Sequence, residues 1–301
     1  MDTSVELVRH LLQSVVYIHT TVSRDHPSTK ILGNERLGSG VVVDPSGLIL
    51  TVNYVVTGGQ TISVAFQKGR RAKAEIVAQD FEVGLALIKV NRQGLIAADV
   101  GTGDVVERCD EVVLLGAMQP QERRVTGGLV TYIGEFEGYW EYLLDRAIIS
   151  NAPNPGYGGG GLFATSGRLA GTVSLNLQEI ARSSLAIPTD FYRNHRDEMM
   201  RYGRVVSRPR RAWLGVFAQV VEEGVVVYGV VPDGPGDRGG LQEGDIIVSL
   251  NAEEVGSRRD LYMNLWRHEP GEALTFEVMR DNKMRRFEVK GGDRAHFYRQ
   301  L

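Results

Sequence analysis

The chain has 301 residues, of which 43% are hydrophobic and 24% charged, and its formal net charge at pH 7 is -3. This length is sufficient for two domains with separate cores. The small charge gives no reason to expect nucleic acid or an anionic membrane surface as a partner.

The sequence shows neither a membrane span nor a secretory signal. No apolar stretch is long enough to cross a bilayer. Residues 1–6 lack the basic start and the apolar stretch that a signal needs. We therefore expect a cytoplasmic protein by default, and a periplasmic one if a signal has been removed.

Cofactor and metal chemistry find no support in the sequence. Cys109 is the only cysteine, which excludes an internal disulfide and a multi-cysteine metal site. The histidine and acidic residues show no cluster with the spacing of metal ligands. We expect the chain to use no metal and no cofactor.

The first hundred residues predict a short helix followed by β-structure. Val5, Val8 and Leu11 recur at helical spacing. The Pro-Ser-Gly sequence at 45–47 lies between two apolar segments, which indicates a hairpin. Short strands without helices between them predict an all-β barrel. Predicted strands lie at 14–20, 38–44, 48–51, 62–66, 72–78 and 85–90.

A glycine-rich stretch, residues 154–162, reads Asn-Pro-Gly-Tyr-Gly-Gly-Gly-Gly-Leu. Glycines in such a turn let backbone amides point inward, where they can stabilise a developing oxyanion. The alternative is a plain flexible loop.

Three segments resemble motifs of the HtrA (Deg) family of serine peptidases: residues 38–56, residues 83–89 and the glycine-rich stretch. The resemblance implies a trypsin-like double β-barrel. The family places the histidine, aspartate and serine of its catalytic triad in these motifs. Here the three positions are occupied by Tyr54, Gly84 and Gly158.

These substitutions remove the groups that triad chemistry uses. Glycine has no side chain, and an unperturbed phenol has a pKa of about 10, so Tyr54 keeps its proton at neutral pH. We predict that the chain is not an enzyme and that the oxyanion turn, Gly156, Tyr157 and Gly158, is vestigial. We also expect the phenols of Tyr54 and Tyr157 to fill the space that the triad leaves. The alternative is residual or rerouted serine-type endopeptidase activity.

The C-terminal part of the chain resembles the PDZ modules that follow the barrel in HtrA proteins. The sequence Gly-Leu-Gln-Glu-Gly-Asp-Ile-Ile at 240–247 is the most specific match. The resemblance implies a groove in which a peptide adds a strand and loop amides hold its carboxylate. The alternative is that the leucines belong to the core and the groove is closed. The expected peptide-binding residues are Arg211, Leu214, Gly215, Val216, Phe217, Leu261 and Leu265.

We therefore predict a mainly β protein: a trypsin-like double β-barrel at 1–204, a linker at 205–210, an α+β PDZ domain at 211–291 and a C-terminal tail at 292–301. We expect the tail to be disordered, with docking in a neighbour's groove as the alternative.

The expected function is that of an inactive HtrA-like pseudoprotease, acting as an adaptor, scaffold or regulatory subunit. Its partners would be polypeptide segments or protein C-termini. The family resemblance implies a homotrimer with residues 15–18 at the contacts, or a mixed oligomer with an active relative. A purely structural oligomer is a further alternative.

Overall fold

The structure is a computed structural model that describes residues 3–102, 104–177 and 182–299. The chain divides into two compact units. The first contains Met1–Arg24, Leu32–Phe136 and Asp145–Val206. The second combines the C-terminal segment Ser207–Leu301 with the short pieces Asp25–Ile31 and Glu137–Leu144.

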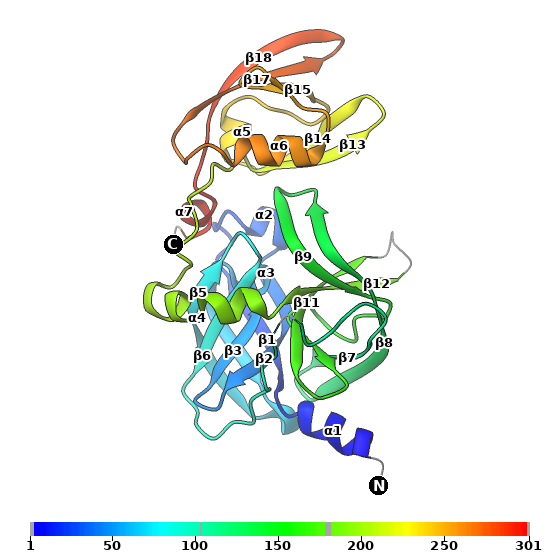
Figure 1. The fold of residues 1–301 in the computed structure, drawn as a ribbon. Helices are drawn as coiled ribbons and strands as arrows, with labels where there is room; N and C mark the ends of the chain where they lie inside the picture. The colour runs from blue at the N-terminus through cyan, green and yellow to red at the C-terminus, as the bar shows by residue number, and fades with distance from the viewer. Residues whose placement is uncertain (1–2, 103, 178–181, 300–301) are drawn as a thin grey trace. The chain divides into compact units, whose positions relative to one another are not determined.

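The first unit begins with a closed barrel of strand order β1-β2-β3-β6-β5-β4 (Figure 1). The predicted hairpin is confirmed, because Val41 pairs with Leu50 across it and Gly47 has the positive φ of its turn, 98°. The strands are β1 (Val15–Val22), β2 (Glu35–Asp44), β3 (Leu48–Val52), β4 (Gly59–Ala65), β5 (Arg71–Asp80) and β6 (Leu85–Val90). The helices are α1 (Thr3–Leu11), α2 (Thr29–Leu32), α3 (Asn53–Val56) and the 3-10 helix η1 (Gln67–Gly69).

Most of the segment expected at subunit contacts is buried within this barrel, with Tyr17 partly exposed. Strand β1 pairs with both β2 and β4, so it has a neighbour on each side. Val15, Val16 and Ile18 are each 0% exposed. The structure therefore does not support residues 15–18 as contacts between subunits.

A second closed barrel completes the first unit, with strand order β10-β11-β12-β9-β8-β7. Its core contains Leu114, Ile148, Leu162 and Val173, all 0% exposed. The prediction of a mainly β double barrel is confirmed. The strands are β7 (Glu111–Gln119), β8 (Glu122–Gly138), β9 (Tyr142–Ser150), β10 (Gly161–Ala164), β11 (Leu169–Leu177) and β12 (Ser183–Pro188).

Helix α4 (Asp190–Tyr202) follows the second barrel. Gly203 ends it in the left-handed region at φ 68°, and its amide donates to Met199 O. The amide of Gln79 in β5 donates to Gly203 O, which ties the helix end to the first barrel. Thr189 precedes the helix, but its hydroxyl donates to backbone carbonyls, Gly101 O at 3.1 Å among them, and makes no capping bond.

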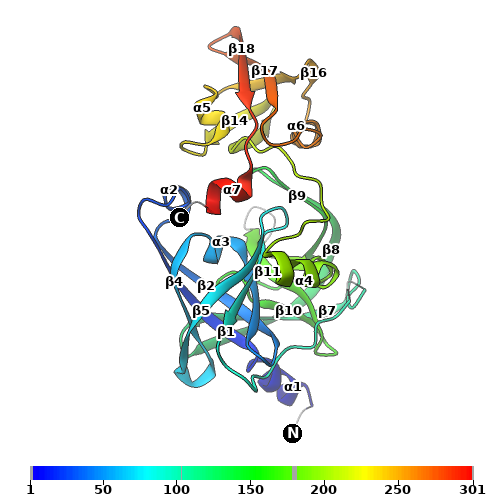
Figure 2. The same ribbon diagram turned by 90° about the vertical axis from the view of Figure 1, so that its left-hand side faces the viewer.

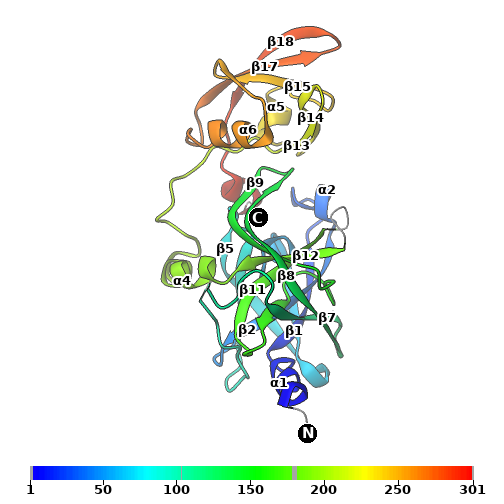
Figure 3. The same cartoon turned by 45° about the vertical axis from the view of Figure 1, so that its right-hand side comes forward.

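The second unit is built on a sheet of order β13-β14-β15-β17-β18, with β16 paired to β15. Strands β17 and β18 form a long hairpin (Figure 2), and α6 packs beside β13 (Figure 3). The core contains Leu250, Phe276 and Val278, all 0% exposed. The elements are β13 (Val216–Val221), β14 (Gly224–Val230), α5 (Pro235–Arg238), β15 (Ile246–Leu250), β16 (Glu253–Glu254), α6 (Arg258–Leu265), β17 (Ala273–Arg280) and β18 (Lys283–Lys290).

The C-terminal tail contains a short helix, α7 (Arg294–Arg299), where the sequence analysis expects disorder. The rings of Phe297 and Tyr298 lie 5.0 and 5.6 Å from the ring of Trp213, between centroids. These aromatic contacts stabilise the folded conformation of the tail. Gln300 and Leu301 lie outside the described residues.

The ion pair between Asp245 and Arg280 should contribute to the stability of the second unit. Asp245 is 0% exposed and binds the Arg280 guanidinium at 2.5 and 2.7 Å. Replacing Arg280 by methionine leaves this carboxylate buried without a countercharge, with Gln242 N still donating to it at 2.9 Å. Arg280→Met should therefore lower the free energy of unfolding by about 3–5 kcal/mol. The matched control is Arg267→Met, which breaks the exposed Arg267–Glu253 pair and should cost about 1 kcal/mol or less. Equal losses in urea denaturation would contradict the expectation.

Candidate functional site

Tyr54, at the family's histidine position, lies in α3 directly after β3. The preceding residue is fixed on both sides: Asn53 N donates to Gly84 O at 2.7 Å, and Gln79 Nε2 donates to Asn53 Oδ1 at 2.5 Å. The Tyr54 hydroxyl donates to Ser174 O at 2.7 Å. Burial raises the pKa of this phenol. Tyr54 therefore acts as a protonated hydrogen-bond donor.

Gly158, at the family's serine position, is packed against this phenol. A side chain at position 158 would overlap the Tyr54 hydroxyl and come within 3.0 Å of Ser174 O. The residues at 54 and 158 are therefore coupled by volume, because the phenol occupies the space a serine would need.

The glycine-rich stretch is tightly packed and not a flexible loop. Gly158 O accepts from Ser39 N at 2.8 Å, and Gly159 N donates to Val173 O at 2.7 Å. Gly159 has φ 97°, and a side chain there would overlap Ser39 O. A side chain at Gly160 would overlap Leu115 O. The glycines let this backbone approach the barrel strands closely.

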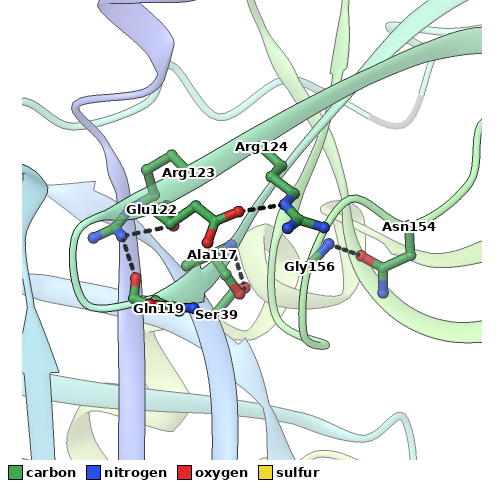
Figure 4. Close-up of polar contacts among 8 residues, drawn as sticks. All are labelled: Ser39, Ala117, Gln119, Glu122, Arg123, Arg124, Asn154 and Gly156. Carbon is green, nitrogen blue, oxygen red and sulfur yellow. Dashed lines mark hydrogen bonds and ion pairs between the residues drawn. The ribbon is translucent and has the colours of Figure 1, made fainter.

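Two amides of the predicted oxyanion turn bind groups within the fold. Gly156 N donates to Asn154 Oδ1 at 3.1 Å, and Tyr157 N donates to Ala117 O at 3.1 Å. Ser39 Oγ accepts from Ala117 N at 2.9 Å close by (Figure 4). An incoming oxyanion would have to compete with these internal acceptors for the two amides.

Gly84, at the family's aspartate position, forms a turn and makes hydrogen bonds through its backbone. Its φ is 83°, its amide donates to Asp80 O at 3.0 Å and its carbonyl accepts from Asn53 N. This left-handed conformation favours glycine. The residue holds the turn that presents Tyr54.

The ring of Tyr157 has a different neighbour from that of Tyr54. Its ring centroid lies 6.5 Å from that of Tyr17. Burial, and then the proximity of Tyr157, raise the pKa of Tyr17. Of the two phenols expected to fill the triad space, Tyr54 is the one with a contact to Ser174.

Several histidines have partners elsewhere in the fold. His19 binds Glu35 at 2.5 Å, His195 Nδ1 lies 3.1 Å from Phe191 O and His268 Nδ1 lies 2.7 Å from Glu272 Oε2. Within residues 3–102, 104–177 and 182–299, no group of three or more His, Cys, Asp or Glu side chains could hold a metal ion.

The second unit contains the predicted carboxylate-binding loop, residues 214–216, and the loop holds a carboxylate. Glu141 is 3% exposed. Its two carboxylate oxygens accept from Leu214 N at 3.0 Å and from Val216 N at 2.8 Å. Gly215 between them has φ 75°, which turns neighbouring amides to one side. Burial raises the pKa of Glu141, while the loop amides and Arg294 act in the opposite direction.

The other predicted peptide-binding residues have different surroundings. Leu261 and Leu265 are 0% exposed and belong to the core, so they match the closed-groove alternative. The Arg211 guanidinium lies 5.0 Å from the centre of the Trp266 ring, where a cation–π contact holds it. The Phe217 ring lies 6.0 Å from that of Tyr139.

Sequence reasoning missed Glu141 and its neighbours. They lie at the tip of the β8–β9 hairpin, which the sequence assigns to the barrel domain. The segment 136–142 reads Phe-Glu-Gly-Tyr-Trp-Glu-Tyr. Four aromatic rings in seven residues of a hairpin end are unusual for a solvated turn, and this density is the feature that could have indicated a binding contact.

Comparison with known proteins defines the class. Residues 38–171 match the family described as trypsin-like peptidase domain, and residues 212–290 match the PDZ domain. The chain therefore combines a trypsin-like peptidase domain with one PDZ domain.

Individual relatives confirm the predicted resemblance to HtrA-type proteases. A probable periplasmic serine endoprotease, DegP-like, from Ectopseudomonas mendocina is 30% identical over 279 residues, which are 86% of this chain and 56% of the relative. The protein of the same name from Hahella chejuensis is 32% identical over 81% of this chain and 54% of its own length. The chain thus spans about half the length of these relatives.

Solved structures agree. The HtrA-type protease AlgW with tripeptide has a TM-score of 0.60 and 26% identity, and the match covers 97% of each chain. The serine endoprotease from Yersinia pestis has a TM-score of 0.58 and 25% identity over 97% of this chain and 98% of the other.

The comparisons correct two predictions. The prediction that the chain is not an enzyme is contradicted, because the relatives and the similar structures are named proteases and point to a protease. That prediction rested on three positions, whereas the similarity extends over most of the chain. The cytoplasmic default is not supported either, since the relatives are named periplasmic. In the described part of the chain, no helix combines the length and apolarity that crossing a membrane requires.

The coupling between positions 54 and 158 can be tested by a double-mutant cycle. Gly158→Ser overpacks the space beside the phenol and should lower the free energy of unfolding by about 1–3 kcal/mol. The same serine should cost less in a Tyr54→Ala background, because the overlapping hydroxyl is gone. Gly127→Ser is the control, since its Cβ would meet only Val112 O at 3.8 Å. A Gly158→Ser penalty of the same size in both backgrounds would argue against the coupling.

Proposed function

We propose that this chain binds polypeptide segments with a free carboxylate through residues 214–216 of its PDZ domain. The observation that carries the proposal is the pair of loop amides, Leu214 N and Val216 N, that converge on one carboxylate. Such oriented donors recognise a carboxylate whether it belongs to a side chain or to a chain terminus.

The edge of β13 supports the same proposal. Ala218 N donates to Tyr139 O at 2.6 Å, so this strand already donates a backbone hydrogen bond to an acceptor outside the sheet. A peptide that adds itself as a strand would use such bonds for affinity and the loop amides for its terminus. The role that follows is that of an adaptor, scaffold or regulatory subunit.

Serine-type endopeptidase activity is the second candidate function, and the names of the relatives favour it. Positions 84 and 158 offer neither a carboxylate nor a hydroxyl, and burial raises the pKa of the Tyr54 phenol. Hydrolysis would therefore have to draw its nucleophile and its base from other residues.

The proposal also includes a compartment and an assembly. We propose a periplasmic location, because the relatives are named periplasmic. A homotrimer, or a mixed oligomer with another HtrA-type chain, is the proposed assembly, with contacts outside residues 15–18. Light scattering of the purified chain would distinguish these assemblies from a monomer.

Peptide binding is tested on the full chain with the heptapeptide Glu-Phe-Glu-Gly-Tyr-Trp-Val, called here the probe peptide. It keeps a tyrosine two residues before the terminal carboxylate, which is the spacing between Tyr139 and Glu141. We expect saturable binding in titration calorimetry. A C-terminal carboxamide should bind at least about tenfold more weakly, because hydrogen bonds to a charged group contribute about 1.5–3 kcal/mol. Equal affinity of the two forms would contradict carboxylate recognition.

The endopeptidase candidate predicts hydrolysis of casein together with covalent labelling by a fluorophosphonate probe. Mass spectrometry would identify the labelled serine, which cannot be at position 158. Replacing that serine by alanine should abolish both labelling and cleavage. Cleavage that persists in the variant would indicate a contaminating protease, and the absence of both signals would argue against hydrolysis by this chain.

A further inference from the structure

We propose that the tip of the β8–β9 hairpin, residues 137–142, is an internal ligand of the PDZ domain, and that an external polypeptide must displace it. The inference rests on the proposed function, since it concerns the same loop. All contacts that carry it lie within the second compact unit.

The side chain of Glu141 stands where a terminal carboxylate would bind. One oxygen accepts from Leu214 N and the other from Val216 N, at 3.0 and 2.8 Å, and the amide of Gly215 adds to them. A carboxylate at 3% exposure is tolerated only when such donors replace its water. The amides that an external carboxylate needs are therefore already engaged.

The backbone of the tip also imitates an added strand. Tyr139 O, two residues before Glu141, accepts from Ala218 N at 2.6 Å. Ala218 lies two residues beyond Val216 along β13. One segment thus meets both the loop and the strand edge, in the spacing that a bound peptide would have.

Side chains of α6 hold the tip from the other side. The Tyr262 hydroxyl donates to Gly138 O at 2.7 Å and accepts from Glu141 N at 2.9 Å. Arg258 bridges the partners, with Nε donating to Ala218 O at 3.0 Å and Nη1 donating to Glu137 O at 3.4 Å. The turn is therefore bound on both faces, by β13 and by α6.

A further contact comes from the C-terminal segment, where Arg294 Nη1 donates to Glu141 O at 3.2 Å. The backbone of Glu141 is in the left-handed region, at φ 53°. A non-glycine residue adopts this conformation only when surrounding contacts offset its cost. The contacts of the tip therefore hold Glu141 in a left-handed conformation.

An internal ligand lowers the apparent affinity for an external one by a predictable route. The apparent dissociation constant equals the intrinsic constant divided by the fraction of molecules whose loop is open. Because the hairpin is part of the same chain, its effective concentration at the loop does not fall on dilution. Removing the Glu141 carboxylate should therefore tighten binding of the probe peptide.

The experiment compares the wild-type chain of 301 residues with Glu141→Ala and Glu141→Gln. Titration with the probe peptide should show binding at least about tenfold tighter in Glu141→Ala than in wild type. Glu141→Gln should fall between them, because it keeps an acceptor but loses the charge. Glu223→Ala is the matched control: it removes an exposed glutamate from the β13–β14 turn and should bind as wild type does.

Hydrogen exchange supplies a readout that needs no ligand. In wild type the amides of Leu214 and Val216 should be protected, and their exchange should accelerate at least about tenfold in Glu141→Ala but not in Glu223→Ala. Unchanged exchange of these amides would overturn the internal ligand.

The two proposals fail in different ways. Equal probe affinity in wild type and Glu141→Ala, with saturable binding in both, would overturn the internal ligand and leave peptide binding intact. No binding in any variant, with accelerated exchange in Glu141→Ala, would overturn peptide binding while the contact with the hairpin tip stands.

Discussion

A buried carboxylate is the constraint on which the second unit depends. Glu141 can leave water only because Leu214 and Val216 point their amides at it. Those amides converge because Gly215 adopts a positive φ. The three-residue loop is thus shaped by its backbone and not by its side chains, two of which are leucine and valine directed into the core. A site made of backbone amides selects a carboxylate by charge and geometry. It does not distinguish a carboxylate of this chain from one of another polypeptide.

In the first unit the corresponding constraint is the limited space beside Gly158. The Tyr54 phenol reaches the carbonyl of Ser174 across the space beside Gly158. Gly159 and Gly160, which follow Gly158, allow the backbone to lie against Ser39 and Leu115 without collision. Each of these features depends on the others, because a side chain at 158 and a phenol at 54 cannot occupy the same place. Positions 54 and 158 therefore form one structural unit, although the chain separates them by about a hundred residues.

Much of the fold was accessible from the sequence, because its determinants are local. The Pro-Ser-Gly turn and its β-branched flanks specify the β2–β3 hairpin, and glycine at 203 specifies the end of α4. The partners of the site residues were not accessible. Tyr54 and Ser174 are 120 positions apart, and Glu141 and Leu214 are 73 apart. The expectation that residues 15–18 form subunit contacts came from the family resemblance, and the burial of Val15, Val16 and Ile18 in the first barrel argues against it. The sequence motif that predicts the loop at residues 214–216 does not indicate that Glu141 binds to it.

Binding and hydrolysis make different demands on this scaffold. Binding needs only oriented amides and a strand edge, and the contacts of Glu141 and Tyr139 satisfy both within the second unit. Hydrolysis needs a nucleophile and a base in mutual contact. The likeness to serine endoproteases accumulates over 279 residues, most of which define the scaffold, whereas the chemistry depends on a few side chains. A protein can therefore keep a peptide-binding loop like that of a PDZ domain whichever residues carry out hydrolysis. Recognition also depends on occupancy: the amides of Leu214 and Val216 already donate to Glu141, so an external carboxylate can use them only after Glu141 has left.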